Sequence, residues 1–153
     1  MVSGCAGTLL HIMSASSGLL CPACNGSLRT AHATYGVLSC DACGGVWTDE
    51  AATKALRTTG DGEITSVAKE AAAHAEGPIP PDRPRRRCPE CRNHLRKSTI
   101  AGVQIDSCST HGTWFDRGEV EAIYAAAKKP GTTSFGDVAT GILEVFGALA
   151  SAL

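Results

Sequence analysis

The chain has 153 residues, with 14 Lys and Arg against 15 Asp and Glu, so its formal net charge is -1. Only 5% of the residues are aromatic, while 17 are Gly and 7 are Pro, which leaves few side chains to fill a large core. This length accommodates one or two small domains and excludes a large multidomain enzyme. The near-neutral charge excludes a polycationic protein that wraps nucleic acid. We therefore expect something other than apolar burial to stabilise the fold.

Charge is distributed unevenly along the chain. Residues 1–77 carry four bases and seven acids, residues 78–130 carry ten bases and six acids, and residues 131–153 carry two acids and no base. The basic segment favours an acidic partner, although a charge of this size is also common on a solvated surface.

Residues 1–20 are expected to form a flexible N-terminal leader, within which Met13 is an alternative start of translation. The first residues show neither the basic stretch nor the long apolar run of a secretory signal. We therefore expect a reducing, cytoplasmic location, where closely spaced cysteines bind metal. Disulfides are the alternative if that location is wrong.

One motif occurs twice, about 67 residues apart. Cys21-Pro22-Ala23-Cys24 recurs as Cys88-Pro89-Glu90-Cys91, and the segment from Cys40 to Trp47 recurs from Cys108 to Trp114. Each copy reads as a turn, a β-hairpin, a second turn and a helix, so the repeat predicts two small units of the same kind.

The hairpin is clearest in the second copy. Apolar Val103 and Ile105 alternate with polar residues, which is the pattern of a half-buried strand. Gly102 supplies the bend, and residues 95–100 are the expected partner strand.

A helix is expected after the second turn of each copy. Asp116 precedes Glu119 by three residues, a capping-box pattern that begins a helix running to about Lys128. The first copy has a weaker helix pattern, expected from Asp49 to about Thr58.

Two further segments flank the second copy. Residues 58–87 are expected to form a linker, helical from 63 to 75 but poorly packed because its apolar residues are small, then rich in Pro and Arg. Residues 129–153 are expected to form an apolar C-terminal helix that packs on a ribbon, with partner docking or self-association as alternatives. Membrane insertion is disfavoured because Glu144 interrupts a short apolar run. The apolar stripe of this helix comprises Val138, Ile142, Val145, Phe146, Leu149 and Leu153.

The cysteines of the two copies form two groups with the spacing of zinc ligands. Two short chelating turns can supply the four ligands of one tetrahedral ion, so we expect two Zn²⁺ per chain. Iron remains an alternative for the first, all-cysteine group. The expected ligands are Cys21, Cys24, Cys40 and Cys43 in the first copy and Cys88, Cys91, Cys108 and His111 in the second.

Both metal sites are expected to be structural. Each group fills four coordination positions, whereas a catalytic zinc usually keeps one position open for water. A unit of about 40 residues cannot bury enough apolar surface to fold alone, so zinc binding would supply its folding free energy. Loss of Cys91 is therefore expected to unfold the second unit only. The side chains expected to cover the metals are Trp47 and Trp114 with Val37, Leu95, Val103 and Ile105.

These motifs resemble the transcription-factor-type zinc-finger family, small zinc ribbons similar to that of transcription factor IIB. The family pattern is a Cys-Pro-x-Cys turn, a Gly-Val hairpin, a Cys-x-x-Cys-Gly-Gly-x-Trp turn, and an Asp before a Gly-Glu helix start. Residues 21–57 and 88–128 match it as two tandem copies, but His111 replaces the fourth Cys and one Gly is missing before Trp114. The resemblance implies a small, metal-stabilised α+β fold of two zinc ribbons, each a hairpin with a short helix, joined by the linker. It implies little about activity.

The sequence thus predicts a non-catalytic zinc-binding protein, a regulatory or interaction module with a protein partner. The alternative is a transcription-associated protein that binds nucleic acid through the basic patch at residues 83–97. That patch lacks interleaved aromatic residues for base stacking. Neither the partner nor the oligomeric state follows from the sequence. The arginines expected to contact nucleic acid are Arg83, Arg85, Arg86 and Arg87.

Overall fold

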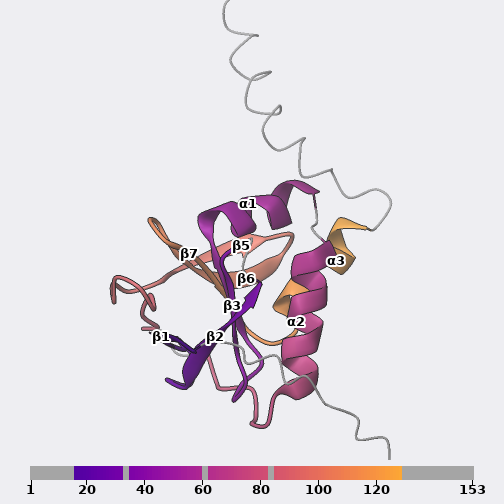
Figure 1. The fold of residues 1–153 in the computed structure, drawn as a ribbon. Coiled ribbons are helices and arrows are strands. Elements are labelled where there is room, and N and C mark those ends of the chain that lie inside the picture. The colour runs from indigo at the N-terminus through magenta and orange to yellow at the C-terminus, as the bar shows by residue number, and fades with distance from the viewer. Residues whose placement is uncertain (1–15, 33–34, 60–61, 83–84, 129–153) are drawn as a thin grey trace, which may run out of the picture.

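Seven antiparallel strands form one continuous sheet in the order β1-β2-β3-β4-β7-β6-β5 (Figure 1). This computed structural model describes residues 16–32, 35–59, 62–82 and 85–128. Both sequence repeats contribute to the same sheet, β1 to β4 from the first and β5 to β7 from the second. The strands are β1 Ser16–Leu20, β2 Ser27–His32, β3 Val37–Cys40, β4 Val46–Asp49, β5 Arg96–Ile100, β6 Val103–Cys108 and β7 Gly112–Phe115.

The two units meet where β4 pairs with β7, a junction that we call the seam. Trp47 pairs with Trp114 at its centre, with Val46 opposite Phe115 on one side. Because the two tryptophans occupy corresponding positions of the repeat, the antiparallel pairing relates the units by an approximate twofold axis. The remaining pairs are Thr48 with Thr113 and Asp49 with Gly112.

The predicted hairpins are confirmed, but each unit also has a strand after its second turn, and the first unit has β1 before its first turn. Strands β5 and β6 lie where the hairpin of the second copy was predicted. The additional strands, β4 and β7, begin after the second turn and supply the seam. They were missed because four residues are too short for an alternation pattern, and because a helix was expected directly after the second turn.

The boundary of the predicted leader is wrong. Residues 16–20 form β1, which pairs with β2 through Ser16 opposite Arg29 and Leu20 opposite Ser27. In the second unit the corresponding bridge joins Arg87 to His94. Residues 1–15, together with the C-terminal helix predicted at 129–153, lie outside the described residues.

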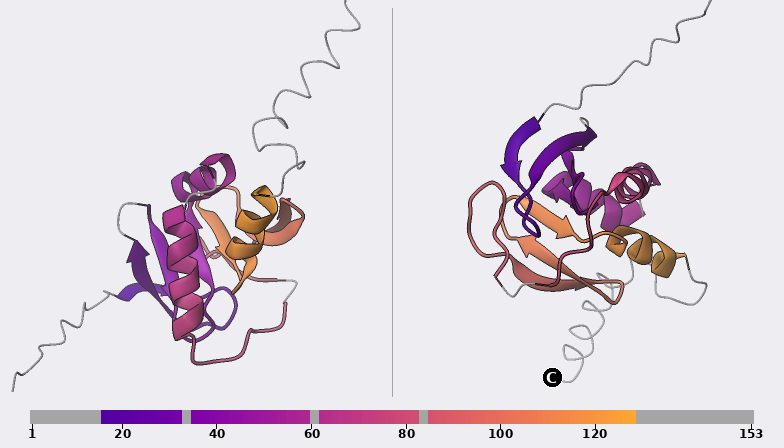
Figure 2. Two further views of the ribbon diagram at one scale, coloured as in Figure 1. Left: turned by 90° about the vertical axis from the view of Figure 1, so that its right-hand side faces the viewer. Right: turned by 90° about the horizontal axis from the view of Figure 1, so that it is seen from below.

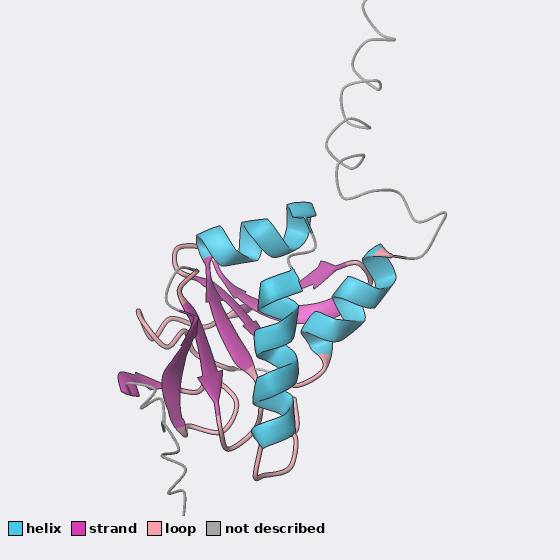
Figure 3. Cartoon of the chain, turned by 45° about the vertical axis from the view of Figure 1, so that its right-hand side comes forward, coloured by secondary structure: helices cyan, strands magenta, loops and turns pink. Residues whose placement is uncertain are grey.

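Three helices lie on one side of the strands, as the left view of Figure 2 and Figure 3 show. They are α1 Glu50–Thr59, α2 Gly62–His74 and α3 Glu119–Ala127. Their apolar side chains form one core with the facing side chains of the sheet. This core includes Ala52, Leu56, Ile64, Ala68, Val120 and Ile123 from the helices and Val37, Val46, Ile100, Ile105 and Phe115 from the strands.

The segment between the repeats is part of the fold rather than a spacer, which corrects the prediction of a poorly packed linker. Helix α2 buries Ile64, Thr65 and Ala68, and it contacts α3, β2 and β3. The chain beyond α2 is also attached, because the Gly77 N–H donates to the Ala42 carbonyl at 2.8 Å. Arg117 of the second unit donates to the Gly77 carbonyl at 3.3 Å.

The opposite face of the sheet carries the cysteine turns and both tryptophans. Side chains alternate between the faces of a strand, so Val46 and Phe115 face the helices while Trp47 and Trp114 face the cysteines. Leu95 lies with the tryptophans, as predicted. The prediction is wrong for Val37, Val103 and Ile105, which belong to the core on the helix side.

The two predicted helix caps differ. The Asp49 carboxylate accepts the Ala52 N–H at 2.7 Å, which confirms it as the cap of α1. Asp116 donates its own N–H to the Glu119 carboxylate at 2.8 Å, one half of the predicted capping box. The side chain of Asp116 does not cap α3, because Gly118 occupies the N-cap position of this helix.

In the part of the chain that the structure describes, no helix combines the length and the apolar character needed to cross a bilayer.

Gly112 provides a test of the seam. A Cβ atom at this position would lie 2.0 Å from the Thr48 carbonyl oxygen, and Gly112 has a φ of +149°. We expect Gly112→Ala to lower the free energy of unfolding of the zinc-loaded protein by about 2–4 kcal/mol, since strain and steric clash add. Denaturant unfolding followed by tryptophan fluorescence measures this loss.

Gly102→Ala is the matched control, because Gly102 also has a positive φ but no atom lies within 4 Å of its added Cβ. Its expected cost is the left-handed strain alone, about 1 kcal/mol. Equal losses in the two variants would show that close approach across the seam contributes nothing.

Candidate metal centres

The first cysteine group lies between the turn before β2 and the turn before β4. The Sγ atoms of Cys21 and Cys43 are 3.6 Å apart, and those of Cys24 and Cys40 are 3.5 Å apart. Backbone N–H groups of Ala23 and Gly26 point at these sulfurs, at 3.4 Å each. All four side chains of this group are buried or nearly so.

The second group lies at the corresponding turns of the second unit. Cys91 Sγ is 3.8 Å from Cys108 Sγ, and His111 Nδ1 is 3.8 Å from Cys88 Sγ and 3.5 Å from Cys108 Sγ. His111 therefore takes the place of the fourth cysteine through Nδ1. This group is more exposed than the first, since only Cys88 is fully buried.

These distances fit tetrahedral zinc and exclude disulfides. A Zn–S bond of about 2.3 Å places two sulfurs of a tetrahedron about 3.8 Å apart, and a disulfide would require about 2.05 Å. The four ligand atoms of each group lie within 4.8 Å of one another. All seven cysteines of the described residues are free thiols. The two groups are thus suited to hold one Zn²⁺ each.

The pKa values show why each group needs a cation. Interaction with the Cys40 and Cys43 sulfurs raises the pKa of Cys21 above its usual range, and interaction with the Cys21 and Cys43 sulfurs lowers the pKa of Cys40 to about 2. Burial raises the pKa of Cys88 to about 12. Although burial opposes it, donation from the backbone of Thr110 and from His111 lowers the pKa of Cys108 to about 6. Thiolates this close ionise together only when a metal ion neutralises them.

Each tryptophan contacts the metal turn of the other unit. Trp47 of the first unit donates its indole N–H to the Glu90 carboxylate at 3.2 Å, and Glu90 lies between the ligands Cys88 and Cys91. Trp114 of the second unit covers Gly45, where an added Cβ would lie 2.2 Å from the indole ring. Because of this approximate twofold symmetry, the packing of each metal turn depends on a tryptophan of the other unit.

Arg86 is buried within the second unit, which corrects its assignment to a nucleic-acid surface. Its Nη1 atom donates to Asp106 at 2.9 Å and to Asp116 at 2.7 Å, and its side chain is 1% exposed. Asp116 also accepts the Trp114 indole N–H at 2.9 Å, and Lys97 donates to Asp106 at 3.1 Å. A side chain held in this way cannot contact phosphate.

Comparison of the two copies could have revealed this network from the sequence. Arg86 corresponds to Leu19 in the first copy, and Asp106 corresponds to Leu38. Both leucines pack against the tryptophan side of the sheet. An apolar pair in one unit is thus replaced by a buried ion pair in the other.

Burial and the charges of the same network change the pKa of the Glu119 carboxyl. Burial of this side chain, together with the nearby charges of Asp116 and Asp106, raises the pKa of the Glu119 carboxyl to about 7. Its hydrogen bond from the Asp116 N–H and the charge of Arg86 oppose the shift. Glu119 therefore links the start of α3 to the buried ion pair.

Of the other arginines predicted to contact nucleic acid, those that the structure describes are not buried like Arg86. Arg85 and Arg87 are exposed, and Arg83 lies outside the described residues. Arg87 donates to the Arg92 carbonyl at 3.0 Å, which places a further exposed arginine beside them. The site residues missed were Asp106 and Glu90, because acidic partners of buried groups leave no motif.

A model of the family described as "Transcription factor zinc-finger" matches residues 87–126, which contain all four ligands of the second group. These residues match a zinc ribbon of the transcription factor IIB type. The match does not extend to the first unit, whose metal group is seen in the structure alone. Searches of curated proteins and of solved structures found no match.

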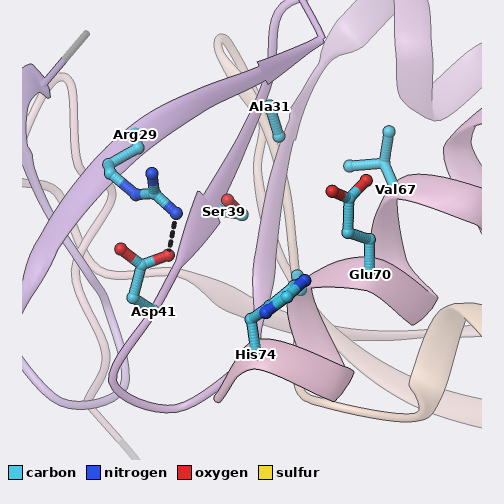
Figure 4. A pocket seen from close by; sticks show the side chains of 8 residues that line it. Arg29, Ala31, Ser39, Asp41, Val67, Glu70 and His74 are labelled. Carbon is cyan, nitrogen blue, oxygen red and sulfur yellow. Dashed lines mark hydrogen bonds and ion pairs between the residues drawn. The ribbon is translucent and has the colours of Figure 1, made fainter. Parts of the chain in front are cut away.

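A hollow lies between α2 and strands β2 and β3, with a volume of about 100 Å³ (Figure 4). Arg29 and Asp41 form an ion pair on its sheet side. Glu70 and His74 project from α2 opposite them. Because its arginine is already paired, the hollow offers no unmatched positive charge.

Removing one ligand tests whether the units are independent. Cys91→Ser should lower the zinc content from two ions to one per chain. We also expect the indole N–H signal of Trp47, in the first unit, to leave its native position in a ¹H–¹⁵N spectrum, because its acceptor Glu90 lies in the turn that loses its metal.

Glu90→Gln is the control, since it keeps an acceptor for Trp47 and should retain both zinc ions. A Trp47 signal unchanged in Cys91→Ser would show instead that each unit folds around its own ion, as the sequence suggested.

A double-mutant cycle tests the buried ion pair. Arg86→Leu alone leaves Asp106 buried without its main partner and should cost about 3 kcal/mol of stability. Asp106→Leu should cost less, because Arg86 keeps its ion pair with Asp116 at 2.7 Å. The double variant restores the Leu19–Leu38 arrangement of the first unit and should recover most of the loss, measured by denaturant unfolding. Additive losses would mean that the two side chains act independently.

Proposed function

We propose that the protein is a non-catalytic, zinc-stabilised interaction module that presents one rigid surface to a protein partner. The observation that carries this proposal is that two four-ligand metal groups lie on one continuous sheet. Two metal-stabilised units joined in this way provide a preorganised surface, which lowers the entropic cost of binding. We further propose that the first unit is a second ribbon of the same kind, and that the protein acts in the reducing cytoplasm.

The metal groups support a structural role. Four ligand atoms in each group satisfy a tetrahedral ion and leave no position for a reacting water. The hollows at α2, beside the second metal turn and between the two units have volumes of about 100, 190 and 200 Å³. These volumes are below the roughly 300–1,000 Å³ of typical small-molecule pockets.

Nucleic-acid binding is the second candidate function. It is favoured by the exposed arginines Arg85, Arg87 and Arg92, which lie around one hollow. It is weakened by the burial of Arg86 and by the burial of both tryptophans, which removes them from base stacking.

Affinity capture from nuclease-treated lysate, followed by reconstitution from purified components, tests the proposal. We expect a protein that survives nuclease treatment, binds the zinc-loaded chain with defined stoichiometry in calorimetry, and is released by a chelator. Recovery of nucleic acid alone, lost on nuclease treatment, would favour the second candidate.

Cobalt substitution tests the non-catalytic part separately. Co²⁺ in both sites should give the ligand-field bands of four-coordinate thiolate complexes, and added azide should leave them unchanged. A spectral change with azide, at unchanged cobalt content, would reveal an open coordination position and would contradict a purely structural role.

A further inference from the structure

The strongest unassigned feature is a hollow between the first metal turns of the two units, which we call the arginine pocket. It has a volume of about 200 Å³. The first unit contributes a largely neutral wall and the second unit a basic one. The lining residues are Leu20, Cys21, Pro22 and Asn25 from the first unit and Arg85, Arg86, Arg87 and Arg92 from the second.

The positive charge of this pocket is locally unbalanced. None of the described residues that line it carries a carboxylate, whereas Asp41 and Glu70 line the hollow at α2 and Glu50 lines the hollow beside the second metal turn. Arg86 is neutralised by Asp106 and Asp116, but Arg85, Arg87 and Arg92 are exposed. Like charges gathered at one place favour an anionic ligand.

The walls of the pocket are held in place by the backbone. Asn25 and Arg92 occupy corresponding positions in the two metal turns, with φ values of 63° and 64°. Each turn is closed by a hydrogen bond to the first ligand residue, from Asn25 to the Cys21 carbonyl and from Arg92 to the Cys88 carbonyl, both at 3.0 Å. Arg87 donates across to the Arg92 carbonyl at 3.0 Å. Metal binding thus preorganises the arginines.

The neighbouring surface favours a short acidic peptide over a nucleic-acid backbone. The pocket lining contains no aromatic side chain within the described part of the chain, so bases would find no stacking partner there. Leu20, on the rim, is 40% exposed and offers an apolar contact that a peptide side chain can use.

We propose that the arginine pocket binds a carboxylate-bearing segment of a partner protein, an acidic stretch with an adjacent apolar residue. This inference rests on the proposed interaction function and names the chemistry of the partner. The pocket holds one or two carboxylates between Arg85, Arg87 and Arg92, while Leu20 contacts the neighbouring apolar side chain.

A direct binding measurement tests this inference without any knowledge of the partner. The probes are a fluorescein-labelled Glu-Glu-Leu-Glu-Glu-Leu peptide, its Gln-for-Glu counterpart, and a single-stranded and a duplex oligonucleotide. We expect anisotropy to report binding of the acidic peptide only, with an affinity that falls as salt rises.

Two charge-matched triple variants assign the site. Arg85→Ala with Arg87→Ala and Arg92→Ala should weaken peptide binding about tenfold, since three exposed ion pairs are lost. Lys54→Ala with Arg57→Ala and Lys69→Ala removes the same charge from exposed positions on α1 and α2, and should change the affinity less than twofold. Zinc content and unfolding midpoint are measured for both, to show that each variant is folded.

Four results would overturn the inference. Equal losses of affinity in the two triple variants would mean that the peptide responds only to the net charge of the protein. Tighter binding of an oligonucleotide through the same arginines would mean that the ligand of the pocket is nucleic acid and not a peptide. Loss of zinc from the first site in the arginine variant would show that the arginines are counter-charges for the four thiolates. A failed peptide assay alongside a reconstituted protein complex would reject the pocket while leaving the interaction function intact.

Discussion

The pairing of β4 with β7 is the constraint on which the rest of the structure depends. Each unit is too small to bury much apolar surface alone, and the seam lets both share one core and one tryptophan layer. Trp47 and Trp114 are both at most 1% exposed, and burial of a tryptophan contributes about 5 kcal/mol. Helix α1 contacts both β4 and β7, so it covers the junction on the opposite face. Zinc stabilises each cysteine-containing turn, and the seam holds the turns of the two units in position relative to each other.

The sequence predicts structural features formed by short segments and misses the contacts between distant segments. The ligand sets, the hairpin of the second copy and the cap at Asp49 each depend on residues a few positions apart, and the structure contains all of them. The seam depends on four-residue strands separated by more than sixty residues, for which no periodicity exists. Its signals were Gly112, which admits the close approach of Thr48, and the equivalent tryptophans, whose shared position permits a symmetric pairing.

The buried polar groups were also missed, because a charged residue in a basic run is first read as solvated. Only the difference between the copies distinguishes Arg86 from its exposed neighbours, since Leu19 marks that position as facing the interior. Such an ion pair costs desolvation and adds little net stability against an apolar pair. It does make the two units chemically distinct.

The approximate twofold axis through Trp47 and Trp114 has a consequence for fragments of this chain. A segment that contained only the second unit would expose the free edge of β7 with one tryptophan uncovered. That edge is nearly self-complementary, since it pairs in the intact chain with its own repeat. Two copies of such a fragment would thus pair through β7 as the two halves pair here, and the single chain is in this sense a covalently linked pseudo-dimer.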